Sequence, residues 1–195
     1  MKIDDLLNDI DDNEAIERYP WCNDSLSIRK AKKEIYGEHL LDKDHVFATL
    51  YKERFTKVTD LDMQKKGVDY KSFSRKVDIK VSIGDFRDDY THTEECIPIE
   101  IYQNNKITFD NTKITTDLLF INVNLETEEV YYISVPYSLI KRIVELNLSN
   151  DIFAHLNKLY IKDRKQSDNK SGIFIKMPIY KLVNLPNVLL IKAKL

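Results

Sequence analysis

The chain has no long apolar run and very little cysteine or glycine, and these shortages exclude several classes of protein. No stretch approaches the roughly 18 consecutive apolar residues that a membrane helix needs. The opening segment, MKIDDLLNDIDDNEAIERY, also lacks a basic region followed by an apolar one. We therefore expect a cytoplasmic protein with no membrane partner. Hydrophobic residues make up 43% of the chain and charged residues 32%, a composition typical of a packed globular protein.

The cysteines and histidines are too few and too scattered to indicate a metal or disulfide framework. Cys22 and Cys96 lie far apart with no second pair, which argues against a four-cysteine zinc site. The segment SIGDF has one glycine and is not a phosphate-binding loop. A Gly-x-Ser-x-Gly elbow and a His-Glu-x-x-His helix are also missing, so serine hydrolases and zinc peptidases lack their starting residues.

The sequence predicts one domain of mixed structure. No repeat, low-complexity tract or linker interrupts residues 1–195, and this length suits a single domain with a real core. Residues 1–20 carry seven acidic side chains against Lys2 and Arg18, and we interpret them as an acidic N-terminal extension.

Apolar spacing predicts helices before the middle of the chain. The strongest helical pattern covers 42–58, and a weaker one over 27–40 is predicted to end near Gly37. Later elements are predicted as strands on either side of the turn 126–129, a helix over 137–146, and strands near Ile173 and Val188. Together they predict an α/β (α+β) fold with a mixed central sheet flanked by helices.

The hydrophobic period changes to two over 77–83. There the apolar side chains alternate with Asp78, Lys80 and Ser82, so the polar three share one face of a strand. The segment ending near Tyr70 can pair with this strand as a hairpin through KSFS. That pairing is expected to bring Asp69 toward Asp78.

Two carboxylates on neighbouring strands beside an ammonium group match the needs of metal-dependent phosphodiester hydrolysis. Mg²⁺ prefers oxygen ligands and commonly takes only one or two carboxylates, which leaves positions for water and a phosphate oxygen. The ion polarises the phosphate and lowers the pKa of a bound water. We expect Asp69 and Asp78 to hold Mg²⁺ or Mn²⁺, and Lys80 to serve the nucleophile or offset charge in the transition state.

The order of these residues resembles the signature of the PD-(D/E)XK nuclease superfamily, which has the restriction-endonuclease-like fold. The resemblance rests on the segments GVD and VDIKV, in which Asp78 and Lys80 follow nine and eleven residues after Asp69. It covers about residues 42–135. Val68 stands where the family name has proline, and the second acid is aspartate, which the motif allows. The resemblance implies a restriction-endonuclease-like sheet, a divalent metal cofactor and hydrolysis of DNA.

Some phage and bacterial members of that superfamily are similar over a longer stretch. They carry a QxKGxD segment before the hairpin and a glutamate-bearing strand after the lysine strand. The matching residues here are Gln64, Lys66, Gly67, Asp69 and Glu100. Glu100 lies in the predicted strand CIPIEIYQ, whose Pro98 has no backbone N–H and favours an edge position or a strand start. The resemblance thus makes Glu100 a further candidate catalytic residue.

A simpler interpretation of the hairpin stays open. An acid-x-Lys triplet also occurs at 163–165 and 168–170, so the triplet alone has little meaning in a chain this charged. Asp78 and Lys80 can be ordinary polar residues on the solvated face of a hairpin. The apolar alternation around them and the preceding Gly67 favour the catalytic interpretation.

Basic residues around the hairpin are the candidate contacts to a DNA backbone. They are Lys65, Lys66, Lys71, Arg75 and Lys76. A second basic run over 162–170 has no apolar periodicity, and we interpret it as an exposed loop. One active site per chain cuts one strand, so double-strand cleavage favours a homodimer.

The alternative is a non-catalytic binding or inhibitory protein on the same scaffold. The acidic side chains of 1–20 can mimic phosphates toward a DNA-binding partner, or lie over the basic groove. A residue usage rich in Lys, Asn and Ile hints at a low-GC bacterium or its phage.

Overall fold

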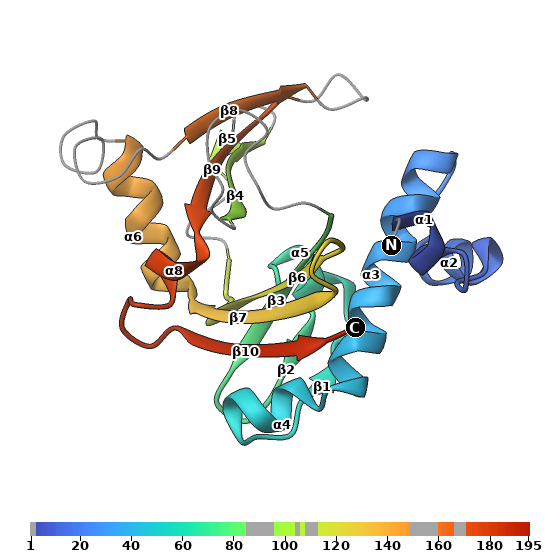
Figure 1. Ribbon diagram of the computed structural model, residues 1–195, viewed down its shortest axis with the longest axis horizontal. Helices are drawn as coiled ribbons and strands as arrows, with labels where there is room; N and C mark the ends of the chain where they lie inside the picture. The colour runs from blue at the N-terminus through green and yellow to red at the C-terminus, as the bar shows by residue number, and fades with distance from the viewer. Residues whose placement is uncertain (1–2, 85–95, 104–105, 108–112, 149–159, 166–170) are drawn as a thin grey trace.

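The computed structural model describes residues 3–84, 96–103, 106–107, 113–148, 160–165 and 171–195 (Figure 1). Six strands form the first sheet in the order β1 (Thr56–Lys57), β2 (Tyr70–Lys71), β3 (Lys76–Ile83), β6 (Asp117–Asn124), β7 (Glu129–Pro136) and β10 (Leu189–Lys194). Four strands form the second in the order β5 (Lys106–Ile107), β4 (Cys96–Gln103), β9 (Ser171–Pro178) and β8 (Tyr160–Lys165). The helices are α1 (Ile3–Leu7), α2 (Asp12–Arg18), α3 (Ser25–Lys43), α4 (Val46–Tyr51), α5 (Leu61–Lys65), α6 (Tyr137–Leu148) and α8 (Ile179–Leu182). The predicted mixed α/β class is confirmed, and the second sheet is a feature that the sequence did not reveal.

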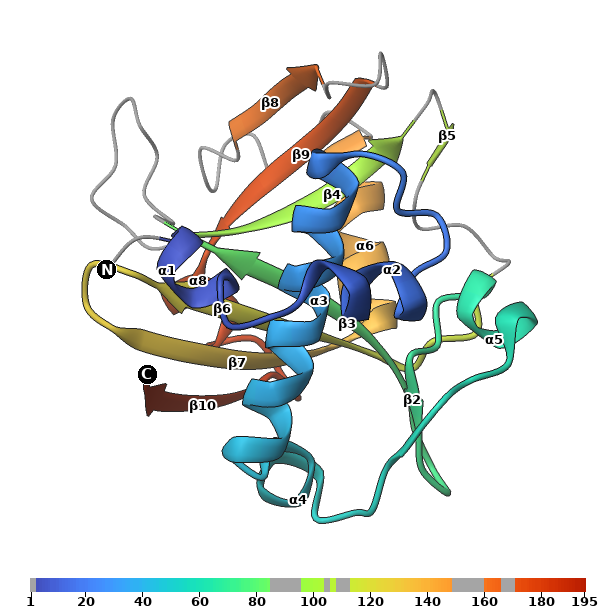
Figure 2. The ribbon, with the colours of Figure 1, turned by 90° about the vertical axis from the view of Figure 1, so that its right-hand side faces the viewer.

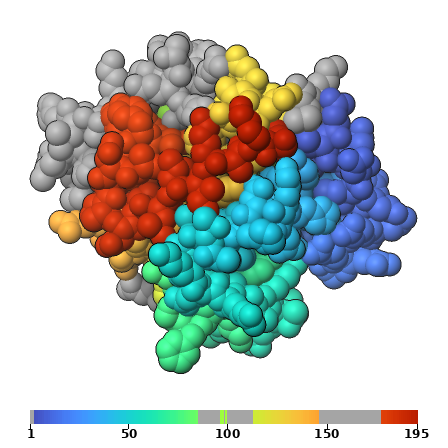
Figure 3. Space-filling model, turned by 60° about the horizontal axis from the view of Figure 1, so that its bottom comes forward, coloured from blue at the N-terminus to red at the C-terminus, as the bar shows by residue number. Residues whose placement is uncertain are grey.

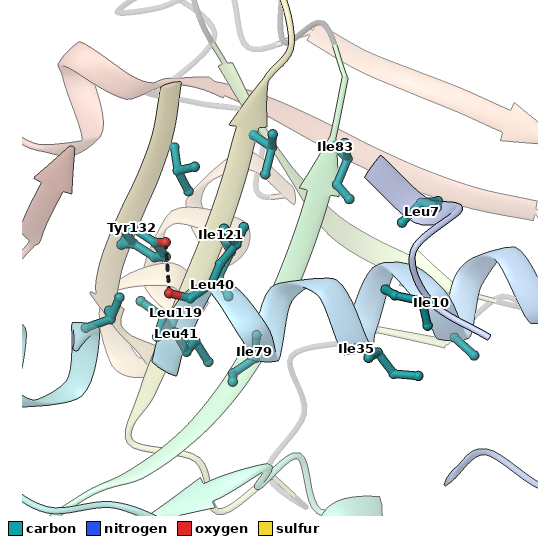
Figure 4. Packing of buried hydrophobic residues seen from close by; sticks show 14 of the residues in the cluster. Leu7, Ile10, Ile35, Leu40, Leu41, Ile79, Ile83, Leu119, Ile121 and Tyr132 are labelled. Carbon is teal, nitrogen blue, oxygen red and sulfur yellow. Dashed lines mark hydrogen bonds between the residues drawn. The ribbon is translucent and has the colours of Figure 1, made fainter. Parts of the chain in front are cut away.

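Strands β6 and β7 are buried on both faces and separate two apolar cores. On one face α3 covers Ile121 and Tyr132, and the Tyr132 hydroxyl donates a hydrogen bond of 3.2 Å to the carbonyl oxygen of Leu40 (Figure 4). On the other face Phe120 packs with Ile97 of β4 and with α6. Figure 2 shows α3 crossing in front of β3 and β6, with α6 behind them. The sheet is therefore the middle layer of the molecule.

Strand β3 follows the alternation that the sequence predicts. Val77, Ile79 and Ile83 belong to the core under α3, so the intervening polar residues point to the other face. Among the described strands, β3 and β6 form the one parallel pair, with Asp78 beside Leu118. The other described pairs are antiparallel.

The longest described helix is α3, and the predicted helix over 42–58 is wrong. Helix α4 covers only part of that range, because His45 before it and Lys52 after it both have left-handed backbone conformations, with φ of 48° and 55°. Helix α3 begins at a capping box, in which Asp24 accepts a hydrogen bond of 2.7 Å from the N–H of Ser27.

The predicted helix end near Gly37 is also wrong. Gly37 is buried inside α3, and a Cβ atom there would lie 2.5 Å from Cγ2 of Val81 on β3. The glycine lets the helix approach the sheet closely, so its role depends on packing and not on helix termination.

Residues 3–18 form two helices that pack against α3. Their buried side chains include Leu7 and Ala15. Asp4 pairs with Arg29 of α3 at 2.8 Å, and Asp12 pairs with Lys32 at 2.5 Å. Two of the acidic side chains of the N-terminal segment are thus neutralised by the neighbouring helix.

Part of the basic run over 162–170 is a strand, so its prediction as a loop is wrong. Residues 160–165 form β8, which pairs antiparallel with β9 and places Arg164 opposite Gly172. Backbone hydrogen bonds hold this strand without any apolar alternation in its sequence. Residues 166–170 lie outside the described residues.

The cysteines and the helices bear on two expectations from composition. Cys22 and Cys96 are both buried, and neither forms a disulfide among the described residues. Within the described ranges, no helix combines the length and the hydropathy needed to cross a bilayer.

Candidate active site

The β2–β3 hairpin brings Asp69 beside Asp78, as the sequence predicts. Tyr70 pairs with Val77 in the antiparallel register, and the N–H of Asp69 donates to the Val77 carbonyl oxygen at 2.9 Å. Asp69 Oδ2 accepts a hydrogen bond of 2.7 Å from the N–H of Ile79. Backbone contacts on both sides of Asp78 therefore hold Asp69 in place. We call Asp69 and Asp78 the carboxylate pair.

The turn that leads into β2 is fixed by Gly67, which follows the end of α5. Its φ is 77°. Its N–H donates to the Gln64 carbonyl oxygen at 2.8 Å, and the Val68 N–H donates to the Met63 carbonyl oxygen at 3.1 Å. These two bonds form a Schellman motif. A Cβ atom on Gly67 would lie 3.0 Å from Oγ1 of Thr115, whose hydroxyl donates to the Gly67 carbonyl oxygen. Both the backbone angle and the available space require glycine here.

Lys80 completes the group on the same face of β3. Its Nζ lies 2.7 Å from Oδ1 of Asp78, because side chains two residues apart on a strand point the same way. Asp78 is only 7% exposed, whereas 54% of the Lys80 side chain is accessible. The ammonium group thus lies between a buried carboxylate and solvent.

The carboxylate pair is electrostatically strained. Partial burial, the negative charge of Asp78 and a side-chain hydrogen bond with Asp78 raise the pKa of Asp69 to about 7, although the Ile79 N–H and Lys80 oppose this shift. Burial alone would lower the pKa of Lys80, but the carboxylates of Asp78, Asp69 and Glu34 raise it above its ordinary value. Near neutral pH Asp69 is therefore only partly ionised, while Lys80 stays charged.

Glu34 of α3 belongs to this environment and was not among the residues expected from sequence. Burial raises its pKa, and the nearby ammonium groups of Lys80 and Lys30 act in the opposite direction. The residue flanks the buried stripe of α3, which includes Ala31 and Ile35. In the sequence, the only indication of this position is a glutamate beside an apolar stripe of a helix. That pattern does not tell which strand the helix crosses.

The donor atoms fit a hard divalent cation. Within the described part of the chain, no group of three or more His, Cys, Asp or Glu side chains is arranged as a metal site. Two carboxylates are nevertheless a number that protein sites for Mg²⁺ often supply, with water and substrate completing the shell. A proton on Asp69 and a bound cation would relieve the same repulsion between the two carboxylates, so a cation can take the place of the proton.

The basic residues predicted to bind DNA lie in two places. Lys65 and Lys66 are exposed at the end of α5, where Lys65 lies 4.0 Å from Asp62. Lys71 and Lys76 lie directly opposite each other on β2 and β3, and Lys76 shares the face of Asp78. The hairpin thus carries two lysines close to the carboxylate pair.

Arg75 is held by the protein itself. Its guanidinium donates to Oδ1 of Asp117 at 2.9 Å and lies 5.0 Å from the centre of the Tyr51 ring. Asp117 is only 3% exposed, so this ion pair is partly buried. Arg75 therefore anchors the hairpin to the start of β6, whatever else it contacts.

Glu100 is on β4, where its backbone lies opposite Phe174 of β9. This strand belongs to the second sheet and not to the sheet of β3. Pro98 lies opposite Lys176 of β9. The pairing of β4 with β5 covers only Tyr102 and Gln103, so the other side of Pro98 is an edge among the described strands, as the sequence predicts. The side chain of Glu100 lies outside the described residues.

Asn122 continues the polar face of β3 onto β6. It lies beside Ser82 in the parallel register and is completely buried. Neither side-chain atom has a hydrogen-bond partner among the residues that the structure describes. A buried amide of this kind costs stability, and Asn122 lies four residues along the sheet from Leu118, the neighbour of Asp78.

No protein-family model and no curated protein sequence matches this chain. The chemistry of the hairpin and of its neighbours is therefore the basis for a functional conclusion.

Proposed function

We propose that the chain is a Mg²⁺- or Mn²⁺-dependent nuclease of the PD-(D/E)XK type that hydrolyses the phosphodiester bonds of DNA. The observation that carries the proposal is the contact between two carboxylates on adjacent strands, with the Lys80 ammonium 2.7 Å from one of them. Such a pair needs a proton or a cation to relieve its repulsion. The order of Gly67, Asp69, Asp78 and Lys80 along the hairpin is also that of the superfamily which the sequence resembles.

Each residue of the group has a distinct role in this proposal. Asp69 and Asp78 would hold the ion, which when bound would polarise a phosphate oxygen and lower the pKa of a coordinated water. Lys80 keeps its proton near neutral pH because the surrounding carboxylates raise its pKa. It can therefore donate a hydrogen bond to charge that develops on the phosphate, or orient the attacking water. Glu34 helps to keep Lys80 charged.

A DNA substrate is supported by the lysines on the hairpin. Lys71 and Lys76 lie within a few residues of the carboxylate pair, where a phosphate backbone would pass. Phosphate mimicry by residues 1–20 has less support, because Asp4 and Asp12 are paired with side chains of α3. Glu100 stays a candidate whose contribution is tested by substitution alone.

The proposal is tested by cleavage of supercoiled, linear, branched and single-stranded DNA in Mg²⁺ or Mn²⁺. Asp78→Asn and Lys80→Met are expected to lower the rate at least about a hundredfold, since each removes a charged group from the reacting centre. Lys192→Met is the matched control, because Lys192 is similarly exposed, at 48%, and lies 2.7 Å from Glu129. Folded wild-type protein that neither cuts this panel nor binds either metal would remove the proposal.

We also propose a cytoplasmic location and a homodimer for cutting both strands. The two free thiols suit a reducing compartment. Light scattering of the protein with and without duplex DNA tests the dimer. A monomer that makes double-strand breaks in one binding event would contradict it.

A further inference from the structure

Phe73 lies at the tip of the β2–β3 hairpin and is 107% exposed, the largest value among the exposed large hydrophobic residues of the described chain. Neighbouring atoms therefore leave the whole ring accessible. Figure 3 shows the light green hairpin projecting beyond the segments beside it. An uncovered aromatic ring forgoes the hydrophobic stabilisation that burial gives, so the fold itself has no use for this side chain.

The turn that carries Phe73 is held firmly. The hydroxyls of Ser72 and Ser74, on either side of the ring, donate to Oε2 and Oε1 of Glu53 at 2.5 and 2.6 Å. The N–H of Ser72 donates to the Arg75 carbonyl oxygen at 2.9 Å, which closes the turn. The two serine hydrogen bonds hold the pKa of Glu53 below its ordinary value. The ring is thus presented on a preorganised turn, which lowers the entropy cost of binding.

Several basic residues lie near the tip, together with the carboxylate of Glu53. Lys71 and Lys76 face each other across the hairpin, and like charges directly opposite on two strands destabilise the pairing. Lys52 and Arg54 are exposed on either side of Glu53, whose own carboxylate is engaged by the two serines. An anion bound here would relieve the repulsion, so the charge at the tip complements a polyanion.

We propose that the hairpin tip binds a single-stranded segment of the nucleic acid, with an unstacked base on Phe73 and phosphates on Lys71 and Lys76. Stacking platforms flanked by basic residues bind single strands in this way, since every base offers a ring face. The inference rests on the proposed function, because it makes the tip part of the substrate path. Asp78 lies five positions after Phe73, which is about 16 Å along a strand.

The test is fluorescence anisotropy with a labelled 20-nucleotide single strand and the matching duplex, in EDTA so that no cleavage occurs. Phe73→Ala is expected to weaken single-strand binding between about fivefold and a hundredfold, and Phe73→Trp to retain it. Tyr180→Ala is the matched control, because Tyr180 is 49% exposed and has the Lys181 ammonium 5.6 Å from its ring centre. Thermal unfolding of Phe73→Ala should match wild type, since the ring has no packing to lose.

The outcomes separate this inference from the proposed nuclease. Unchanged single-strand binding in Phe73→Ala, equal losses on single strand and duplex, or no nucleic-acid binding by wild type would each overturn it. Metal-dependent cleavage combined with unchanged single-strand binding by Phe73→Ala would refute only the proposed role of the hairpin tip. Single-strand binding that depends on Phe73, without cleavage in either metal, would refute the proposed nuclease activity and support the proposed role of the tip. A binding loss restored by Trp but not by Leu at position 73 supports stacking over general apolar contact.

Discussion

Replacement of Asp69 by asparagine should stabilise the metal-free protein at alkaline pH and abolish its response to metal. The pKa of Asp69 rises from 3.8 to about 7 in the folded chain, which is a difference of about 4 kcal/mol at about 1.4 kcal/mol per unit. Because the folded state binds the extra proton, stability falls as the pH rises from about 4 to about 7, and the loss is complete above that range. The asparagine variant carries no such charge.

The expected gain in unfolding free energy is smaller than the difference of about 4 kcal/mol. Asparagine can still accept from the N–H of Ile79, but the bond loses its ionic character, which costs about 1 kcal/mol. A net gain of about 2–3 kcal/mol at pH 8 corresponds to a rise in melting temperature of about 4–12 °C for a chain of this length. At pH 5 Asp69 is protonated in the folded state but ionised in the unfolded state, which accounts for only about 1.7 kcal/mol, so the net gain of the variant should fall to about 1 kcal/mol or less.

The assay is thermal unfolding in EDTA at pH 5 and pH 8, repeated with Mg²⁺ or Mn²⁺. Metal should raise the melting temperature of wild type at pH 8 but not that of Asp69→Asn. Asp117→Asn is the control, since it removes a buried carboxylate paired with Arg75 and should destabilise at both pH values by about 1–3 kcal/mol. An Asp69→Asn variant with the same stability difference at pH 5 and pH 8 would refute the electrostatic strain assigned to the carboxylate pair.

Three further substitutions test the packing around the site by thermal or urea unfolding. Gly37→Ala should lower the free energy of unfolding by about 1–3 kcal/mol despite the better helix propensity of alanine, because its Cβ would lie 2.5 Å from Val81. Adding Val81→Ala should restore part of that loss. A stabilised Gly37→Ala variant would contradict this contact. Gly67→Ala should cost at least about 1 kcal/mol, since φ is 77° at that position, and an unchanged urea midpoint would show that the turn tolerates a side chain. Asn122→Leu should gain about 1–3 kcal/mol by removing the unsatisfied amide, and a destabilised variant would show that the amide has a partner.

The hairpin was predictable because its signals are local. The alternation over 77–83 identifies one strand, and the short segment KSFS is a turn between it and β2. The position of Asp69 beside Asp78 follows from that pairing alone. The turn between β6 and β7 was found for the same reason.

The features that were missed depend on residues far apart in the sequence. Gly37 looks like a helix end until its contact with Val81 is known, and that contact joins residues separated by more than forty positions. Glu34 enters the site only because α3 crosses β3. The edge strand β8 is held by backbone bonds that leave no mark on its charged side chains. The restriction-endonuclease-like identity of the fold stays a prediction.

The parallel pairing of β3 with β6 has a consequence for the order of events during folding. The carboxylate pair meets through a hairpin that closes over about ten residues, whereas the strand that buries it is made about forty residues later, with Asp78 beside Leu118. Local contacts form sooner than distant ones, because closing a long loop costs more entropy. The two acids are therefore neighbours in water, where both ionise easily, before β6 docks. Their repulsion becomes costly only when β6 docks. Mild acid, which protonates one of the two acids, should therefore accelerate the docking of β6.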